Sequence, residues 1–238
     1  DVLIEGVEQY AASLTLPKRS SHRKMSDEER TEREALQTTL TAQREALTEA
    51  LALVRAQREG AREELLEVLN SKSYNRVVGE FGTFLTTTGQ GIAKDAGYPV
   101  GLMLPGIVYE RLTAVRIHDH DVEVHTVESL HTLRVEFKRL RYTVSFFTDV
   151  LGKESDDFIN ELKKVQDHLG RLNDAVVAQA VLGDLLVDLG ETQADALRAY
   201  LDKLSAEQMQ LQESFVAVWQ RFNTKDIQSK LALAVASV

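Results

Sequence analysis

The sequence contains no cysteine, only three prolines and thirteen glycines, and few aromatic residues, which make up 6% of its 238 positions. Without cysteine the chain has no disulfide framework, no thiolate metal site and no cysteine nucleophile, and its composition fits a reducing compartment. No apolar run approaches the roughly 18 to 20 residues that a membrane-spanning helix needs. We therefore expect a cytoplasmic protein with no membrane partner.

Acidic residues outnumber basic ones by 37 to 28, which gives a net charge of −9 and a pI near 5.2. Non-specific nucleic-acid binding needs a wide basic surface, so nucleic acid is not an expected partner. A local basic groove inside an acidic body remains compatible with a thin polyanion. Ala, Leu, Glu, Gln and Arg are prominent, and because these side chains lose little rotamer freedom in a helix, we expect an all-α fold.

The first half of the chain, residues 1–88, is predicted to form three helices. The first covers 1–16 and ends at Pro17. Ser26, followed by three acidic residues, begins a long helix over 27–70 with a break near Gly60. Ser71 restarts a shorter helix to about Leu85. Four arginines lie beside the apolar stripe of the long helix, where glutamates of the same helix are the expected partners: Arg44, Arg55, Arg58 and Arg62.

A glycine-rich loop over 86–99 separates this half from a second one, residues 99–238. Pro105 is assigned to the first turn of a helix that continues through Val115. The pattern then predicts a helix from a cap at Thr126 or Ser129 to about Val150, ending near Gly152, and one that starts at Ser155. The remaining boundaries are a left-handed stop at Gly170, a new cap at Asn173 or Asp174, and a last long helix or pair of helices with Trp219 and Phe222 as anchors.

Alternating histidines and acids occupy 118–125, and this pattern is reminiscent of a metal site. Ligands two residues apart point to different faces of a helix, so only a loop could gather them around one ion. A solvated acidic turn is the simpler interpretation. We predict neither a metal nor a cofactor.

The stretch 130–142 concentrates one histidine, four cations and a tyrosine in a chain that is otherwise acidic. On a helical wheel of about 100° per residue, Arg134, Lys138 and Arg141 lie within about 80° of His131, with Tyr142 on the same side. Arg139 points away from them. Leu133, Phe137, Leu140, Val144 and Phe147 form the apolar stripe.

Like charges on one helix face repel each other by a few tenths of a kcal/mol per pair. Acids from a facing helix could balance this ridge, with His131 as an ordinary core histidine. An anion is the alternative, because Arg offers a planar fork for phosphate oxygens, Lys a point charge and His a further donor. The sequence favours an anion site.

The motif His131-x-x-Arg134-x-x-x-Lys138-Arg139-x-Arg141-Tyr142, followed by Leu162-Lys163-Lys164-Val165-Gln166-Asp167 and Leu172-Asn173-Asp174, resembles the second repeat of a CHAD domain, the conserved-histidine α-helical domain. The match covers 130–182. This resemblance implies two pseudo-symmetric helical bundles around a central basic groove or pore that binds inorganic polyphosphate without catalysis. It implies a binding set of His131, Arg134, Lys138, Arg139, Arg141, Tyr142 and Lys164, with Arg58, Arg62 and Arg76 as weaker candidates.

The first repeat's own basic helix has no counterpart in residues 1–88, as if the sequence began just after it. Partners implied by the resemblance are polyphosphate itself, its granules and the enzymes that metabolise it. Two other functions remain open, a histidine phosphotransfer domain and a helical protein-interaction scaffold. Phosphotransfer would require an exposed histidine with small neighbours, whereas four cations surround His131. No catalytic set is evident, so we do not predict an enzyme.

Overall fold

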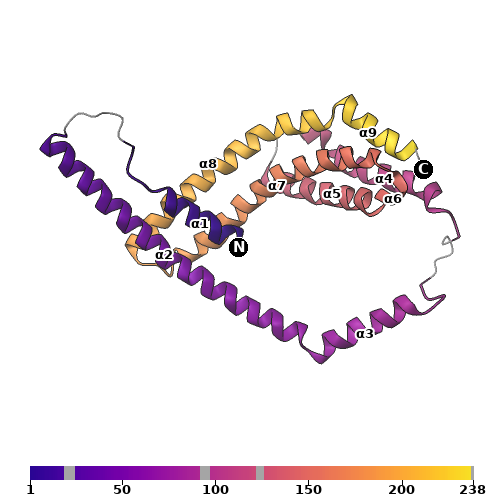
Figure 1. The fold of residues 1–238 in the computed structure, drawn as a ribbon, viewed down its shortest axis with the longest axis horizontal. Coiled ribbons are helices and arrows are strands. Elements are labelled where there is room, and N and C mark those ends of the chain that lie inside the picture. Colours follow the sequence, from indigo (N-terminus) through magenta and orange to yellow (C-terminus); the bar gives the residue numbers. More distant parts are fainter. Residues whose placement is uncertain (19–24, 92–96, 122–125, 237–238) are drawn as a thin grey trace. The chain divides into compact units, whose positions relative to one another are not determined.

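The computed structural model describes residues 1–18, 25–91, 97–121 and 126–236, and within these ranges it contains helices and no strand (Figure 1). The predicted all-α class is confirmed. Among the described residues, no helix is both long enough and apolar enough to cross a membrane. The helices are α1 (Val2–Ser13), α2 (Asp27–Leu69), α3 (Lys72–Thr86), α4 (Val100–Arg116), a 3-10 helix η1 (Ile117–Asp121), α5 (Val127–Phe146), α6 (Thr148–Leu151), α7 (Glu154–Leu185), α8 (Glu191–Phe222) and α9 (Lys225–Ala236).

The chain forms two compact units, and the long helices α7 and α8 contribute to both. Unit 1 comprises Asp1–Ile92 and Ala178–Lys203, and unit 2 comprises Ala93–Val177 and Leu204–Val238. The domain limits expected from the sequence, 1–88 and 99–238, stay a prediction, as does the pseudo-symmetric arrangement of two bundles.

In unit 1, α1 lies antiparallel to α2 and supplies partners for its arginines. Arg44 Nε donates to the Ala11 carbonyl at 3.1 Å, Arg55 pairs with Glu8, and Arg58 Nε lies 2.9 Å from the Asp1 carboxylate. The expectation that glutamates of the same helix would pair with these arginines therefore holds only for Arg62, whose partner is Glu59. A facing helix provides the other acceptors.

The beginning of α2 follows the predicted cap, but the predicted break is wrong. Ser26 accepts from the Glu29 amide while the Glu29 carboxylate accepts from the Ser26 amide, a complete capping box. The helix then continues through Gly60 to Leu69. Glycine within a helix costs only about 1 kcal/mol relative to alanine, which long flanking segments of good helix formers can offset.

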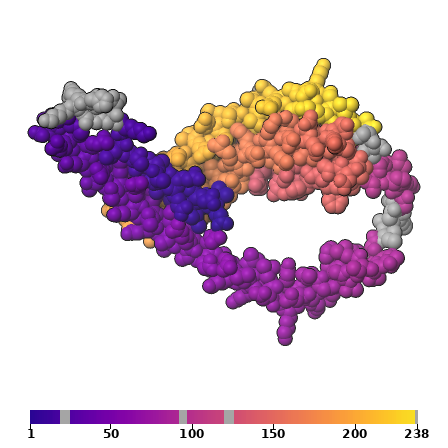
Figure 2. All heavy atoms as spheres, viewed as in Figure 1, coloured from indigo at the N-terminus to yellow at the C-terminus, as the bar shows by residue number. Residues whose placement is uncertain are grey.

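The helix α3 starts at its predicted cap, Ser71, whose hydroxyl accepts from the Tyr74 amide at 3.1 Å. Its apolar residues recur at helical spacing, yet none is buried, and Val77, Phe81 and Leu85 are each more than half exposed. Figure 2 shows α3 as a rod one helix wide. The sequence pattern thus predicted the helix correctly but not its exposure.

Unit 2 has a continuous apolar core to which every one of its α-helices contributes. Phe137 of α5 is at its centre, fully buried, with its ring 4.9 Å from Phe222 and 6.0 Å from Trp219, both in edge-to-face geometry. Trp219 and Phe222 therefore act as the anchors that the sequence predicted. The helix α9 adds Ile227 and Leu231 to the same core.

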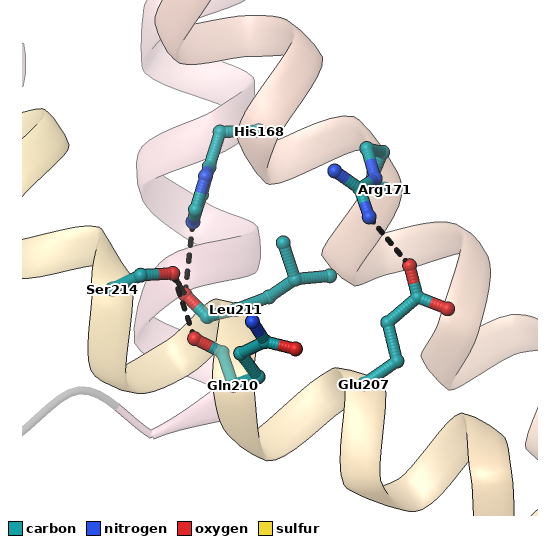
Figure 3. Close-up of polar contacts among 6 residues, drawn as sticks. All are labelled: His168, Arg171, Glu207, Gln210, Leu211 and Ser214. Carbon is teal, nitrogen blue, oxygen red and sulfur yellow. Dashed lines mark hydrogen bonds and ion pairs between the residues drawn. The ribbon is translucent and has the colours of Figure 1, made fainter.

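Within unit 2, α7 and α8 run antiparallel, because their contact partners change in opposite directions. Arg221 of α8 lies 3.7 Å from Glu161, His168 Nε2 donates to the Leu211 carbonyl at 2.8 Å, and Arg171 pairs with Glu207 at 2.7 Å. Figure 3 shows the last two contacts, with the His168 ring directed at the carbonyl of Leu211. These polar contacts fix the register of α7.

The helix boundaries predicted for the second half are confirmed in part. The helix predicted to run to about Val150 is interrupted, because Phe147 leaves the helical conformation (φ −109°, ψ 22°) between α5 and the short α6. The stop expected near Gly152 is confirmed, since Gly152 adopts φ +73° and ends α6. Pro105 lies inside α4 rather than in its first turn, because the helix already begins at Val100. The predicted stop at Gly170 and the new cap at Asn173 or Asp174 are wrong, since α7 runs unbroken from Glu154 to Leu185 and Gly170 has no positive φ.

Candidate functional site

The basic stretch folds as α5, and its two faces differ as the helical wheel predicted. Thr126 is the N-cap and its hydroxyl accepts from the Ser129 amide at 3.1 Å. Four residues of the predicted apolar stripe are buried, together with Leu130: Leu133, Phe137, Leu140 and Val144. The fifth, Phe147, lies just past the end of α5 and is only partly buried. Arg134, Lys138 and Arg141 are half-buried beside this stripe, whereas His131 and Tyr142 are exposed. We call His131, Arg134, Lys138 and Arg141 the cation ridge.

His131 is held by Asn173 of α7. Its Nδ1 lies 3.0 Å from the Asn173 Oδ1. Because that amide oxygen can only accept, Nδ1–H is the donor, and the hydrogen bond fixes the ring orientation. In the neutral ring Nε2 is then the acceptor nitrogen, and it lies at the end of the ridge.

The position of Asn173 also sets the α5–α7 register. A short connection joins the end of α5 to the start of α7, while the start of α5 meets Asn173 far along α7, so the two helices are antiparallel. Steps of 3, 7 and 10 residues keep to one helix face. From the His131–Asn173 pair these steps place Arg134 opposite Gly170, Lys138 opposite Gln166, and Arg141 opposite Lys163.

The positions placed directly opposite the ridge are not acidic, although Asp167 and Asp174 lie beside them on the same helix. The opposite positions present an amide at Asn173, no side chain at Gly170, an amide at Gln166 and a further cation at Lys163. A Cβ atom built on Gly170 would meet no atom within 4 Å, so the space beside it is open. We call this α5–α7 surface the seam.

Within the described part of the chain, Arg134, Lys138 and Arg141 have no carboxylate at ion-pair distance. The Arg141 guanidinium lies 4.7 Å from the ring centre of Tyr142, a cation–π contact. The Nε atom of Arg141 is buried and has no hydrogen-bond acceptor. The same is true of the Nε2 atom of Gln166. The seam thus has more hydrogen-bond donors than acceptors.

The other two cations predicted for this unit have acidic neighbours. Arg139 lies on the exposed side of α5, 2.5 Å from Glu136, and Lys164 lies 2.7 Å from Glu161. Glu161 also attracts Arg221 at 3.7 Å. Both acids precede their basic partner by three residues, a spacing that brings side chains together on a helix.

The weaker candidates of the first half, Arg58, Arg62 and Arg76, lie in unit 1. Each has a carboxylate close by: Asp1 for Arg58, Glu59 for Arg62, and Glu80 at 3.8 Å for Arg76. Each of these arginines therefore has an acidic neighbour, and their part in anion binding stays a prediction.

The histidine-rich segment of residues 118–125 is described only in part. Its residues up to 121 form η1, where the Asp119 carboxylate accepts from the Asn223 amide at 2.8 Å, and residues 122–125 lie outside the described ranges. Among described residues, no group of three or more histidines and acids is arranged to hold a metal ion.

Sequence reasoning did not assign the α7 side of the seam to the binding set, namely Lys163, Gln166, Gly170 and Asn173, although the motif contains the first, second and fourth of these. Asn173 was interpreted as a helix cap, although Leu162, Val165, Leu169 and Leu172 recur at helical spacing on both sides of Gly170. That uninterrupted apolar stripe was the available sign that α7 is one helix. Once α7 is taken as one helix, its polar residues Lys163, Gln166 and Asn173 fall beside that stripe.

The structure defines a helical protein with a row of cations, and their counter-charge is not found in the described residues. The family model for the CHAD domain matches residues 1–183, more than three-quarters of the chain. The protein belongs to the CHAD domain family. None of the curated proteins matches it significantly.

Proposed function

We propose that this protein binds inorganic polyphosphate along the seam, without catalysis. The observation that carries the proposal is the unbalanced charge of Arg134, Lys138 and Arg141, which meet no acid within the described ranges. Half-buried cations on one helix repel each other and lose hydration, so a counter-charge stabilises them. Membership of the CHAD domain family is consistent with a polyphosphate-related role.

The form of the seam suits a linear polyanion. From His131 to Arg141 the cation ridge extends over ten residues, about 15 Å at 1.5 Å per residue. Its donors differ in kind, with a planar fork from each arginine and a point charge from Lys138. A chain of phosphate groups would offer acceptors along this whole length, including to the buried donors of Arg141 and Gln166 after small side-chain rotations.

The residues of the seam support binding rather than hydrolysis. Cleavage of a phosphoanhydride bond generally requires carboxylates that position metal ions and a nucleophile. Neither the cation ridge nor the α7 positions facing it include a carboxylate. We therefore propose that the protein is a binding module and not an enzyme.

The proposal extends to partners and location. Polyphosphate granules and polyphosphate-metabolising enzymes are the partners that such a module would meet. A cysteine-free composition fits the cytoplasm, where thiols stay reduced.

The test is calorimetric titration with long-chain polyphosphate, orthophosphate and single-stranded DNA at two salt concentrations. Arg134→Gln with Lys138→Gln should weaken polyphosphate binding at least about 100-fold, because each charged hydrogen bond contributes about 1.5 to 3 kcal/mol. The matched control, Arg171→Gln with Lys230→Gln, removes the same charges from residues paired with Glu207 and Asp226. Equal affinity of both double variants, or no binding by the wild type, would overturn the proposal.

A further inference from the structure

An apolar groove of about 410 Å³ opens at the start of the cation ridge. It lies wholly within unit 2, between the first turns of α5 and the middle of α7. Its volume is in the range of ordinary small-molecule sites, about 300 to 1,000 Å³. The apolar lining consists of Val127, Leu130, Leu169, Leu172, Val176 and Val177.

The lining is aliphatic, and this decides what the groove can accept. Its apolar part includes no Phe, Tyr or Trp, and the one ring in the wall is the His131 imidazole, so a nucleobase would find little surface to stack on. Valine and leucine surfaces instead favour a saturated hydrocarbon, whose burial is driven by the loss of water-exposed apolar area. An aliphatic group is therefore the better occupant.

The polar residues at the edge of the groove favour an occupant with an anionic head group. His131 and Asn173 are part of the wall, and His131 is also the first member of the cation ridge. Arg134 follows one helical turn later on the same face. Glu128 is the acid of the lining and is exposed, so it disfavours an anion at the opposite edge.

We propose that the seam also binds a phosphate monoester with an aliphatic body, which fills the groove while the phosphate binds His131 and Arg134. This inference rests on the proposed function, because it uses the same ridge. It adds a ligand class in which one end of the anionic site is extended by an apolar group. The ester binds as a free molecule, with its aliphatic chain removed from water.

The experiment measures the affinity of the wild-type protein for monoalkyl phosphates from ethyl to decyl, all below their micellar concentrations. Each methylene buried contributes about 0.8 kcal/mol, so affinity should rise about fourfold per carbon until the groove is full and then level off. Affinity that is independent of chain length would overturn the inference. This series needs no variant, so misfolding cannot obscure its outcome.

A groove-filling variant identifies the place of binding. Val177→Trp, at a residue that is 50% exposed, should remove the gain with chain length and leave polyphosphate affinity unchanged. The matched control is Val150→Trp, at a residue 40% exposed and outside the groove, which should retain the gain. A gain that persists in Val177→Trp would contradict the assignment.

Three further ligands separate the competing outcomes. ATP should bind no more tightly than inorganic triphosphate, and a clear preference for ATP would refute the aliphatic assignment. Phosphatidylcholine vesicles containing phosphatidic acid should not bind, because their chains are already buried; binding would refute the choice of a free ester. Polyphosphate that binds while alkyl phosphates do not would defeat only this inference, whereas failure of both would defeat the proposed function as well.

Discussion

Neutralising Lys138 should change how polyphosphate binding depends on salt, and not only how strong it is. Each phosphate contact made by a cation releases counterions, so the logarithm of the binding constant falls linearly with the logarithm of salt concentration, by about 0.7 per contact on a single strand. The ridge offers three permanent cations, Arg134, Lys138 and Arg141. The expected slope for the wild type is therefore about −2.1.

Lys138→Gln leaves two of these cations and should give a slope of about −1.4. Between 50 and 200 mM salt, the wild-type affinity should then fall about 20-fold and that of the variant only about sevenfold. Glutamine keeps most of the side-chain volume, so the half-buried position should stay packed. The difference between the two slopes is thus an electrostatic measurement.

Fluorescence or calorimetric titrations at four or more salt concentrations give the slopes. Lys230→Gln is the control, because it removes an equal charge from a lysine that lies 3.3 Å from Asp226 on α9. Its slope should stay at about −2.1. A slope for Lys138→Gln equal to that of both the wild type and Lys230→Gln would show that Lys138 contacts no phosphate, and the reasoning from the cation ridge would be refuted.

Three further predictions concern residues around the seam. Arg139→Gln should weaken polyphosphate binding less than Lys138→Gln in the same titration, because Arg139 must leave Glu136 to reach a phosphate; a larger loss would contradict this ranking. Asn173→Ala should weaken binding about fivefold through the loss of one orienting hydrogen bond to His131, worth about 1 kcal/mol, with an unchanged circular-dichroism spectrum. Phe137→Ala should lower the free energy of unfolding by about 3 to 5 kcal/mol in denaturant titration, because the side chain is fully buried against Trp219 and Phe222; a loss below 1 kcal/mol would contradict its central place in the core.

Local patterns in the sequence predicted much of the fold because they act over single helical turns. The caps at Ser26, Ser71 and Thr126 and the end at Gly152 need only neighbouring residues. The sequence of α5 also sufficed to separate the cation ridge from the apolar stripe, since both follow from one helical period.

Partnership between distant segments could not be predicted in the same way. Arg55 and Arg58 have glutamates nearby on their own helix, yet their partners are Glu8 of α1 and Asp1, the residue just before α1, because tertiary packing brought those carboxylates closer. Asn173 has the chemistry of a helix cap and instead accepts from His131, 42 residues away. Which donor Asn173 meets depends on the α5–α7 register, which the sequence alone did not establish.

Gly170 provides a test of that register through stability. Glycine inside a helix costs about 0.5 to 1 kcal/mol relative to alanine, and a Cβ at this position would meet no atom within 4 Å. Gly170→Ala should therefore stabilise the protein by about 0.5 to 1 kcal/mol and raise the melting temperature by about 1 to 4 °C in a chain of this size.

Gly6→Ala is the contrasting substitution. Gly6 also lies inside a helix, but its added Cβ would be 2.5 Å from the Tyr200 hydroxyl oxygen, so the aromatic side chain would have to move and the gain should be lost. Differential scanning calorimetry of both variants beside the wild type gives the comparison. A Gly170→Ala protein that melts below the wild type would mean that Gly170 ends a helix after all, or that α5 approaches α7 more closely there. In either case the inference of open space opposite Arg134 would be wrong.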